Sequence, residues 1–300
     1  MSDAPNVDTD IRGACLCGAV AFAVAAPYRW FAHCHCSMCR KHHGSLFGTS
    51  IGVARDEFRW LQGTEEIVHY RATAAFERPF CRRCGSTVPA VSHDERYWAV
   101  PAGLLDSDPL ARPRTHIFVA SRSPLVELDD ALPQHAGYPP GIALAEIATR
   151  EYDDSAPLEG SCLCGAVAFS AMEIPRRVVN CYCSVCRRSR AAAFSSTLYV
   201  RSDAFRWIKG QDRVASYAAT SARHYANVLG FCANCGSFMP SGLESPAAMQ
   251  IPAGAIDSPL PPLPALHLYV GSKAPWYEIT DSWPQFEELP PPEQVTGAFR

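Results

Sequence analysis

The feature that most constrains this chain is a set of seven cysteines that occurs twice in the same order. One part of the set, the pattern C-x-C-x-x-C, begins at Cys34 and returns at Cys181, 147 residues later. Thiols this close in sequence cannot all pair with one another in relaxed disulfides. They can converge on a soft metal ion, because thiolates bind zinc in preference to cations that favour oxygen ligands. The pattern therefore predicts metal centres in both halves of the chain.

The cysteines belong to a longer internal repeat. The segment GACLCGAVAF at 13–22 corresponds to GSCLCGAVAF at 160–169, and CRRCGS at 81–86 corresponds to CANCGS at 232–237. Each copy has the length of a domain, so the sequence predicts a tandem duplication. The expected parts are a disordered tail at 1–12, a first zinc domain at 13–134, a linker at 135–159, a second zinc domain at 160–288 and a loose tail at 289–300.

The composition fits two packed domains in a reducing compartment. The chain has 300 residues, of which 48% are hydrophobic and 19% charged, so it can bury a sizeable core. The formal net charge is −3 and no dense Lys/Arg run occurs, so the sequence does not indicate a surface that binds nucleic acid. No apolar run is long enough to span a membrane. The first ten residues are acidic and polar, unlike a secretory signal. We therefore expect a cytoplasmic protein with reduced cysteines.

Short apolar segments between glycines and prolines predict a mainly β fold. In the first copy we expect strands at 19–25, 46–53, 56–60, 65–71, 97–101 and 115–120. No long segment repeats with the period of a helix. We expect a short helix after Cys39 and a second one in the linker, at 142–150.

Four cysteines of each copy form two distant pairs, C-x-C and C-x-x-C. Paired knuckles of this kind are the usual way in which a structural tetrathiolate zinc site is assembled. A glycine follows each pair, which suits a tight turn whose backbone amides face sulfur. The predicted ligands are Cys15, Cys17, Cys81 and Cys84 in the first copy and Cys162, Cys164, Cys232 and Cys235 in the second.

The other three cysteines of each copy suggest an open metal site. They are Cys34, Cys36 and Cys39 in the first copy and Cys181, Cys183 and Cys186 in the second. A zinc ion with three protein ligands keeps a fourth position for water or a substrate atom. Alternatively, a histidine closes a structural site, and the first copy offers His33, His35, His42 and His43. The second copy has no histidine at these positions, so a ligand common to both is not expected.

An open thiolate zinc site can activate a thiol, because the ion lowers the pKa of a coordinated thiol or water. Addition of that thiol to an aldehyde would need little further machinery. Arg40 and Arg187 follow the two trios and are candidates for binding substrate carboxylates, although ordinary surface charge explains them equally well. His116 and His267 recur at the start of a strand, where we expect hydrogen bonding and not metal ligation.

These motifs resemble the glutathione-dependent formaldehyde-activating (GFA) family, also called centromere-protein-V-like. G-x-C-x-C-G, C-x-C-S-x-C-R and F-C-x-x-C-G each occur in both copies. The resemblance implies two zinc-binding β-tent domains related to Mss4-like proteins, with up to four zinc ions per chain. It also implies carbon–sulfur lyase chemistry, in which glutathione and formaldehyde combine as S-hydroxymethylglutathione. By the same resemblance the paired knuckles hold the structural zinc, and the trios hold the catalytic zinc.

Two departures from the usual family pattern stand out. The chain is a tandem, and the aromatic pair Trp276-Tyr277 of the second copy is replaced in the first by Leu125-Val126. If this segment lines the substrate pocket, the first copy has either drifted in specificity or become supportive. The leading hypothesis is a zinc lyase acting on a small-molecule thiol and aldehyde. The alternatives are a non-catalytic zinc scaffold or partner-binding module, and a metal-buffering or redox-sensing protein.

Overall fold

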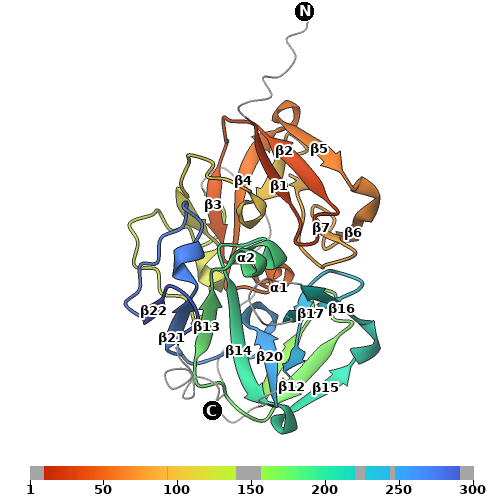
Figure 1. Cartoon of the computed structure of the whole chain (residues 1–300), viewed down its shortest axis with the longest axis vertical. Coiled ribbons are helices and arrows are strands. Elements are labelled where there is room, and N and C mark those ends of the chain that lie inside the picture. Colours follow the sequence, from red (N-terminus) through yellow and green to blue (C-terminus); the bar gives the residue numbers. More distant parts are fainter. Residues whose placement is uncertain (1–9, 93, 140–156, 220–226, 244–246, 291–300) are drawn as a thin grey trace, which may run out of the picture.

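Two similar β modules occupy the upper and lower parts of the molecule in Figure 1. The computed structural model describes residues 10–92, 94–139, 157–219, 227–243 and 247–290. We call the part before residue 140 module one and the part after residue 156 module two. The predicted mainly β fold in tandem is confirmed. In the described ranges, no helix is long and apolar enough to cross a membrane.

Module one contains two sheets and a hairpin. The three-stranded sheet has the order β1 (Ile11–Ala14), β2 (Ala21–Val24), β5 (Phe58–Gln62). The five-stranded sheet has the order β10 (Thr115–Ile117), β3 (Phe31–Cys34), β4 (Gly48–Ala54), β9 (Tyr97–Pro101), β8 (Ala90–Val91). The hairpin joins β6 (Ile67–Arg71) to β7 (Glu77–Cys81). All six strands expected from the sequence are present.

Module two repeats this plan with three sheets. The first has the order β11 (Leu158–Ser161), β12 (Ala168–Ala171), β15 (Phe205–Lys209). The second has the order β19 (Ser241–Leu243), β20 (Ala248–Pro252), β14 (Ser195–Arg201), β13 (Val178–Cys181), β21 (Ala265–Leu268), β22 (Gln285–Phe286). The third joins β16 (Val214–Ala219), β17 (Asn227–Cys232) and β18 (Phe238–Met239).

A seven-residue helix follows the first central strand of each module: α1 (Ser37–His43) and α2 (Ser184–Arg190). The short helix expected after Cys39 is present, but it begins at Ser37, before that residue. The physical reason is the cap: the Cys36 Sγ accepts a hydrogen bond from the Cys39 backbone nitrogen at 3.4 Å and thereby starts the helix at Ser37. The helix expected at 142–150 lies outside the described residues.

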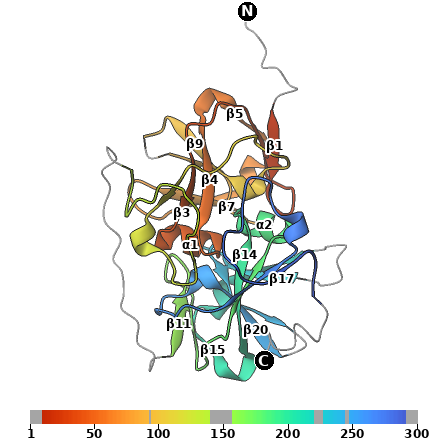
Figure 2. The same ribbon diagram turned by 90° about the vertical axis from the view of Figure 1, so that its left-hand side faces the viewer.

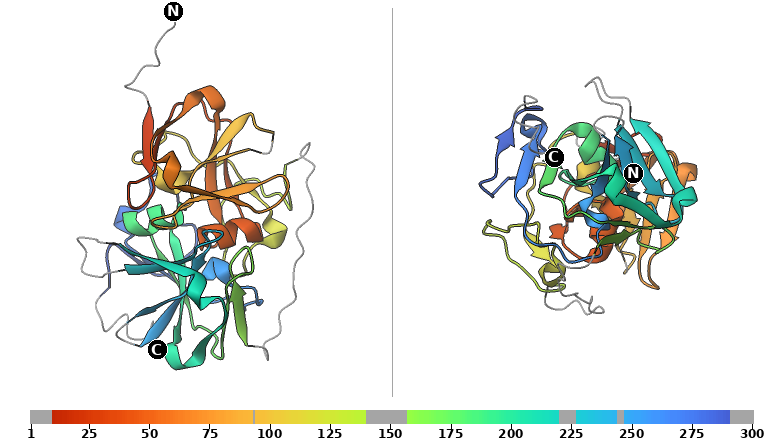
Figure 3. Two further views of the ribbon diagram at one scale, coloured as in Figure 1. Left: turned by 90° about the vertical axis from the view of Figure 1, so that its right-hand side faces the viewer. Right: turned by 90° about the horizontal axis from the view of Figure 1, so that it is seen from below.

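The two modules pack with their short helices at the boundary between them, as Figures 2 and 3 show from two sides. α1 packs on the 3₁₀ turn Ala253–Ala255 of module two, and α2 packs on the corresponding turn Ala102–Leu104 of module one. Both turns contain a glycine because the backbones meet. A Cβ on Gly254 would lie 2.0 Å from the Arg40 backbone oxygen.

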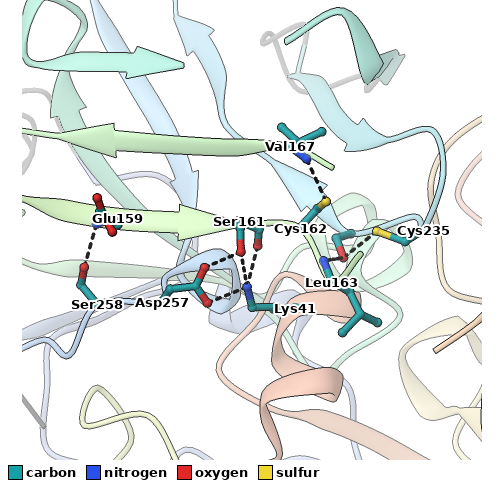
Figure 4. Close-up of polar contacts among 10 residues, drawn as sticks. Lys41, Glu159, Ser161, Cys162, Leu163, Val167, Cys235, Asp257 and Ser258 are labelled. Atoms are coloured by element: carbon teal, nitrogen blue, oxygen red, sulfur yellow. Dashed lines mark hydrogen bonds and ion pairs between the residues drawn. The ribbon is translucent and has the colours of Figure 1, made fainter. Parts of the chain in front are cut away.

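Two ion pairs tie the modules together at equivalent positions of the repeat. The Lys41 ammonium lies 2.6 Å from the Asp257 carboxylate and donates to the backbone oxygen of Ser161 at 2.9 Å (Figure 4). In the other direction, Arg188 lies 2.6 Å from Asp106. The first pair is the more buried, with side chains 13% and 28% exposed against 30% and 42%. One hydrophobic cluster also contains buried side chains of both modules.

Candidate metal centres

The paired knuckles of each module come together in one cluster. The Sγ atoms of Cys15, Cys17, Cys81 and Cys84 all lie within 4.8 Å of one another, as do those of Cys162, Cys164, Cys232 and Cys235. The Sγ–Sγ distances of 3.5 Å for Cys15–Cys17 and 3.7 Å for Cys17–Cys81 suit a tetrahedral zinc ion. Zn–S bonds of about 2.3 Å place the sulfurs about 3.8 Å apart. All fourteen cysteines are unbridged, so the residues fit a metal better than a disulfide.

Backbone geometry prepares these knuckles for a metal. Gly18 has a φ of 76°, a left-handed conformation that turns the chain directly after Cys17. The backbone nitrogen of Val20 then donates to the Cys15 sulfur at 3.3 Å, and Val167 donates to the Cys162 sulfur at 3.2 Å. Backbone amides aimed at sulfur stabilise a thiolate and orient it as a ligand. The expectation drawn from the glycine after each knuckle is therefore confirmed for these two sulfurs.

The two trios also converge. The Sγ atoms of Cys34, Cys36 and Cys39 lie within 4.8 Å of one another, and those of Cys181, Cys183 and Cys186 do the same. In each trio the first cysteine ends a strand, the second caps the helix, and the third lies in its first turn.

Hydrogen bonding favours a thiolate at the middle cysteine of each trio. The Cys34 and Cys39 thiols lower the pKa of Cys36 well below its usual range. For the same reason, hydrogen bonds from Cys181 and Cys186 lower the pKa of Cys183 to about 3. One sulfur of each trio is therefore ready to bind a metal before the others lose their protons.

No histidine completes either trio in the described part of the chain. His33 precedes Cys34 on β3, so its side chain lies on the opposite face of that strand. His35 follows the strand, and its Nε2 is 2.8 Å from His116 Nδ1. His43 Nδ1 lies 2.7 Å from a backbone oxygen of module two. No histidine nitrogen, that of His42 included, and no carboxylate oxygen groups with the three sulfurs within 4.8 Å. The alternative of a site closed by histidine therefore has no support among the residues described.

Each trio has a buried guanidinium near it, which the sequence did not indicate. In module one, Arg78 Nη2 lies 3.8 Å from the Cys39 sulfur, and the negative charge of the trio raises the pKa of Arg78 against the effect of burial. In module two the cation is Arg190, which stacks on Phe238 with its Cζ 3.9 Å from the ring centroid. Burial lowers the pKa of Arg190 to about 10, and negative charge on the Cys186 sulfur opposes this shift.

These two arginines come from different places in the repeat. Arg78 is on β7, where module two has Leu229, and Arg190 ends α2, where module one has His43. A comparison of the two copies by sequence therefore finds neither of them. A zinc ion with three thiolate ligands carries a net negative charge, and a buried cation beside it offsets that charge.

The trios differ in their access to solvent. In module one, Cys36 and Cys39 are buried and pack with Phe118 and Tyr138. In module two, all three cysteines are partly exposed. The trio of module one borders a small, partly open cavity of about 60 Å³, lined among others by Cys34, Cys39 and Arg78.

The two arginines that follow the trios donate hydrogen bonds to nearby backbone oxygens. Arg40 Nε donates to the backbone oxygen of His35 at 3.3 Å, and Arg187 Nε donates to that of Tyr182 at the same distance. Burial lowers the pKa of both guanidinium groups. Each side chain thus ties its helix to the end of the preceding strand.

The paired histidines have the hydrogen-bonding role that the sequence predicted. His116 Nε2 lies 2.9 Å from a carboxylate oxygen of Asp130, and His267 Nε2 lies 3.0 Å from one of Asp281. A carboxylate can only accept, so both Nε2 atoms donate. The Tyr182 hydroxyl lies 2.9 Å from His267 Nδ1. Neither histidine belongs to a metal cluster.

Comparison with known families agrees with this geometry. The family model described as "Glutathione-dependent formaldehyde-activating enzyme" matches residues 10–121 and 157–272, so it covers both modules and most of the chain. The chain belongs to the GFA family. Two copies of the domain are present, and each contains one set of four and one set of three cysteines that could hold a metal ion.

Two proteins illustrate the similarity. A Halomonas elongata protein, provisionally named a glutathione-dependent formaldehyde-activating enzyme, is 33% identical over an alignment of 147 residues. The match covers 43% of this GFA chain and 88% of the relative. A crystal structure of a Rhodobacter sphaeroides protein is 24% identical and covers 33% of this chain and 91% of its own. Its TM-score of 0.29 is too low for detailed comparison.

Proposed function

We propose that this GFA protein is a zinc-dependent enzyme of the carbon–sulfur lyase type, which joins a thiol to a small aldehyde at its cysteine trios. Glutathione and formaldehyde are the proposed substrates, in line with the names of the family and of the Halomonas relative. The observation that carries the proposal is the convergence of three sulfurs without a fourth protein ligand among the residues described. Such a donor set leaves room for an exogenous thiol.

A zinc ion held by a trio would supply a Lewis acid that lowers the pKa of a thiol at its fourth position. The reaction itself is an addition without oxidation or reduction. The thiol sulfur forms a bond to the aldehyde carbon, the π electrons of the carbonyl move to its oxygen, and that oxygen takes up the proton that the thiol lost. The protein therefore has to bring two small molecules together and to balance charge.

The residues around the trios suit this task. The low pKa values of Cys36 and Cys183 favour metal-binding thiolates at neutral pH. Arg78 and Arg190 place positive charge beside the sulfurs, where negative charge gathers. We further propose that Arg40 and Arg187 bind substrate carboxylates through their terminal nitrogens.

The difference in access supports a preferred module for the thiol. The trio of module two is partly exposed and can be reached by a tripeptide from solvent. A cavity of about 60 Å³ beside the trio of module one holds a molecule of a few atoms but not a tripeptide. We therefore propose that glutathione binds more readily at module two.

Zinc content and glutathione binding test this proposal together. The variants are Cys36→Ser, Cys183→Ser and the double variant, each compared with the wild type by metal analysis, calorimetric titration and formaldehyde consumption. We expect about four zinc ions per wild-type chain and about two in the double variant, since four clusters can hold a metal. Glutathione should bind the wild type and fail to bind the double variant. Two zinc ions in the wild type without thiol binding would leave the non-catalytic scaffold as the function.

A further inference from the structure

A cavity of about 320 Å³ lies between the two modules, away from the metal clusters. It opens where segment 112–132 of module one meets segment 262–283 of module two, the yellow and blue segments at the left of Figure 1. No cysteine lines it. His33 faces the cavity from β3, while Cys34, the next residue, faces the trio. The volume is at the lower end of the range for small-molecule sites.

Aromatic rings from both modules form the floor of this cavity. The Tyr277 ring lies 5.3 Å from Phe194, 5.9 Å from Tyr182 and 6.2 Å from Phe47, measured between centroids. Its neighbour Trp276 is buried and packs on Phe31 of module one, at 5.6 Å. The aromatic pair of module two therefore lies in a site shared by both modules, and not beside a trio.

The residues that replace this pair in module one line the same cavity. Leu125 and Val126 occupy the positions equivalent to Trp276 and Tyr277, and all four residues contribute to the lining. Their smaller side chains leave space that a second aromatic pair would fill. Module one therefore contributes aliphatic side chains to the lining at the positions where module two contributes aromatic rings.

One carboxylate from each module faces this space. Asp130 and Asp281 occupy equivalent positions of the repeat, and both side chains remain accessible, at 25% and 19% exposure. Asp281 uses Oδ1 for both His267 and the backbone nitrogen of Trp283, and neither bond engages Oδ2. Burial and the charges of Asp281 and Asp130 raise the pKa of Tyr277, so the two carboxylates act on one phenol.

Negative charge dominates at the rim as well. Glu127 and Glu278 are exposed and also line the cavity. Arg112 contributes a positive charge, but its guanidinium makes two hydrogen bonds to Asp108, at 2.9 and 3.0 Å. The lining therefore offers acceptors whose charge is not cancelled, and a ligand has to bring hydrogen-bond donors and positive charge.

We propose that this cavity binds a small organic ammonium ion with an apolar body. The ammonium group donates to Asp281 and Asp130, while the apolar body packs on Tyr277, Phe194 and Trp276, whose ring faces attract cations. A metal ion suits the site less well, because no cluster of three ligand atoms is found there among the described residues. The ligand would contact both modules and stabilise their association. This inference is independent of the proposed function at the trios.

Calorimetry with the zinc-loaded full chain tests the inference. The probes are phenethylammonium, the neutral 2-phenylethanol and the anionic 3-phenylpropionate, which share an apolar body and differ in charge. Phenethylammonium should bind at least about tenfold more tightly than the other two, since a charge-assisted pair adds about 1.4 kcal/mol or more. Asp281→Asn should weaken its binding about tenfold. Asp203→Asn, at an exposed aspartate of module two, is the matched control and should leave the affinity unchanged.

A second variant keeps the test valid if Asp281→Asn is unstable. Glu127→Lys/Glu278→Lys reverses the charge of two exposed rim residues without removing a packed side chain, and it should weaken binding of the ammonium ion several-fold at low salt. Thermal unfolding should shift upward with phenethylammonium in the wild type and less in either variant. Equal affinity for the three probes, no binding of the ammonium ion, or an unchanged affinity in both variants would overturn the proposal. Zinc content and glutathione binding are measured separately and bear on the trios alone.

Discussion

The two ion pairs between the modules allow a prediction with an internal control. Asp257→Asn and Asp106→Asn remove the same charge at equivalent positions, but the Lys41–Asp257 pair is more buried than Arg188–Asp106. Asp257 also accepts a hydrogen bond from the Ser161 hydroxyl, which in turn accepts one from Lys41. We expect Asp257→Asn to lower the free energy of unfolding by about 2 kcal/mol, between the values for buried and for exposed pairs. Asp106→Asn should cost about 0.5 kcal/mol.

Urea unfolding of the zinc-loaded chain, followed by tryptophan fluorescence, measures this difference. A loss of about 2 kcal/mol corresponds to a fall in melting temperature of about 4 °C for a protein of this size. A double-mutant cycle with Lys41→Met should give a coupling energy of about 1–2 kcal/mol for the buried pair. Equal losses for the two aspartate variants, or a coupling energy near zero, would refute the reasoning that burial of this contact makes it stronger than its counterpart.

Three further predictions concern the module boundary and the trio of module one. Gly254→Ala should destabilise the protein by about 1–3 kcal/mol in urea unfolding, because the new Cβ would lie 2.0 Å from the Arg40 backbone oxygen. Gly137→Ala is the control and should be close to neutral, because a Cβ at that position has no atom within 4 Å. Tyr138→Ala should speed chelator-induced zinc release from the trio of module one several-fold, because Tyr138 packs over it through Phe118, and should leave release from module two unchanged. Burial lowers the pKa of His43 to about 4 from its ordinary value of 6.5. Between pH 6.5 and pH 4 the unfolded chain binds a proton at His43 and the folded chain does not, so the free energy of unfolding falls as the pH drops below about 6.5. His43→Gln should reduce that fall by up to about 1.4 kcal/mol per pH unit, measured by unfolding between about pH 7 and pH 5.

The sequence alone determined the duplication, the division of the cysteines and the approximate strands. Ligands spaced by one or two residues must lie close together in any fold, so Cys34, Cys36 and Cys39 could be grouped without coordinates. Pairing of C-x-C with the distant C-x-x-C needed a further argument, the preference of zinc for two knuckles, and the geometry agrees with it. Strand positions followed from alternating apolar residues, which is a local property. The start of α1 was misplaced because a cysteine, and not the usual serine or aspartate, caps it.

The tertiary structure decided what surrounds these clusters. Arg78 and Arg190 reach their trios from positions that do not correspond in the two copies, so no comparison of the repeats could have found them. The cavity between the modules is lined by Asp130 and Asp281, which are distant in sequence and which only the packing of the two modules brings to the same boundary. The physical reason is that burial, charge balance and cavity shape depend on which segments pack together. Local sequence determines the ligands that a site contains, and packing of the two modules determines its charge, its exposure and the space beside it.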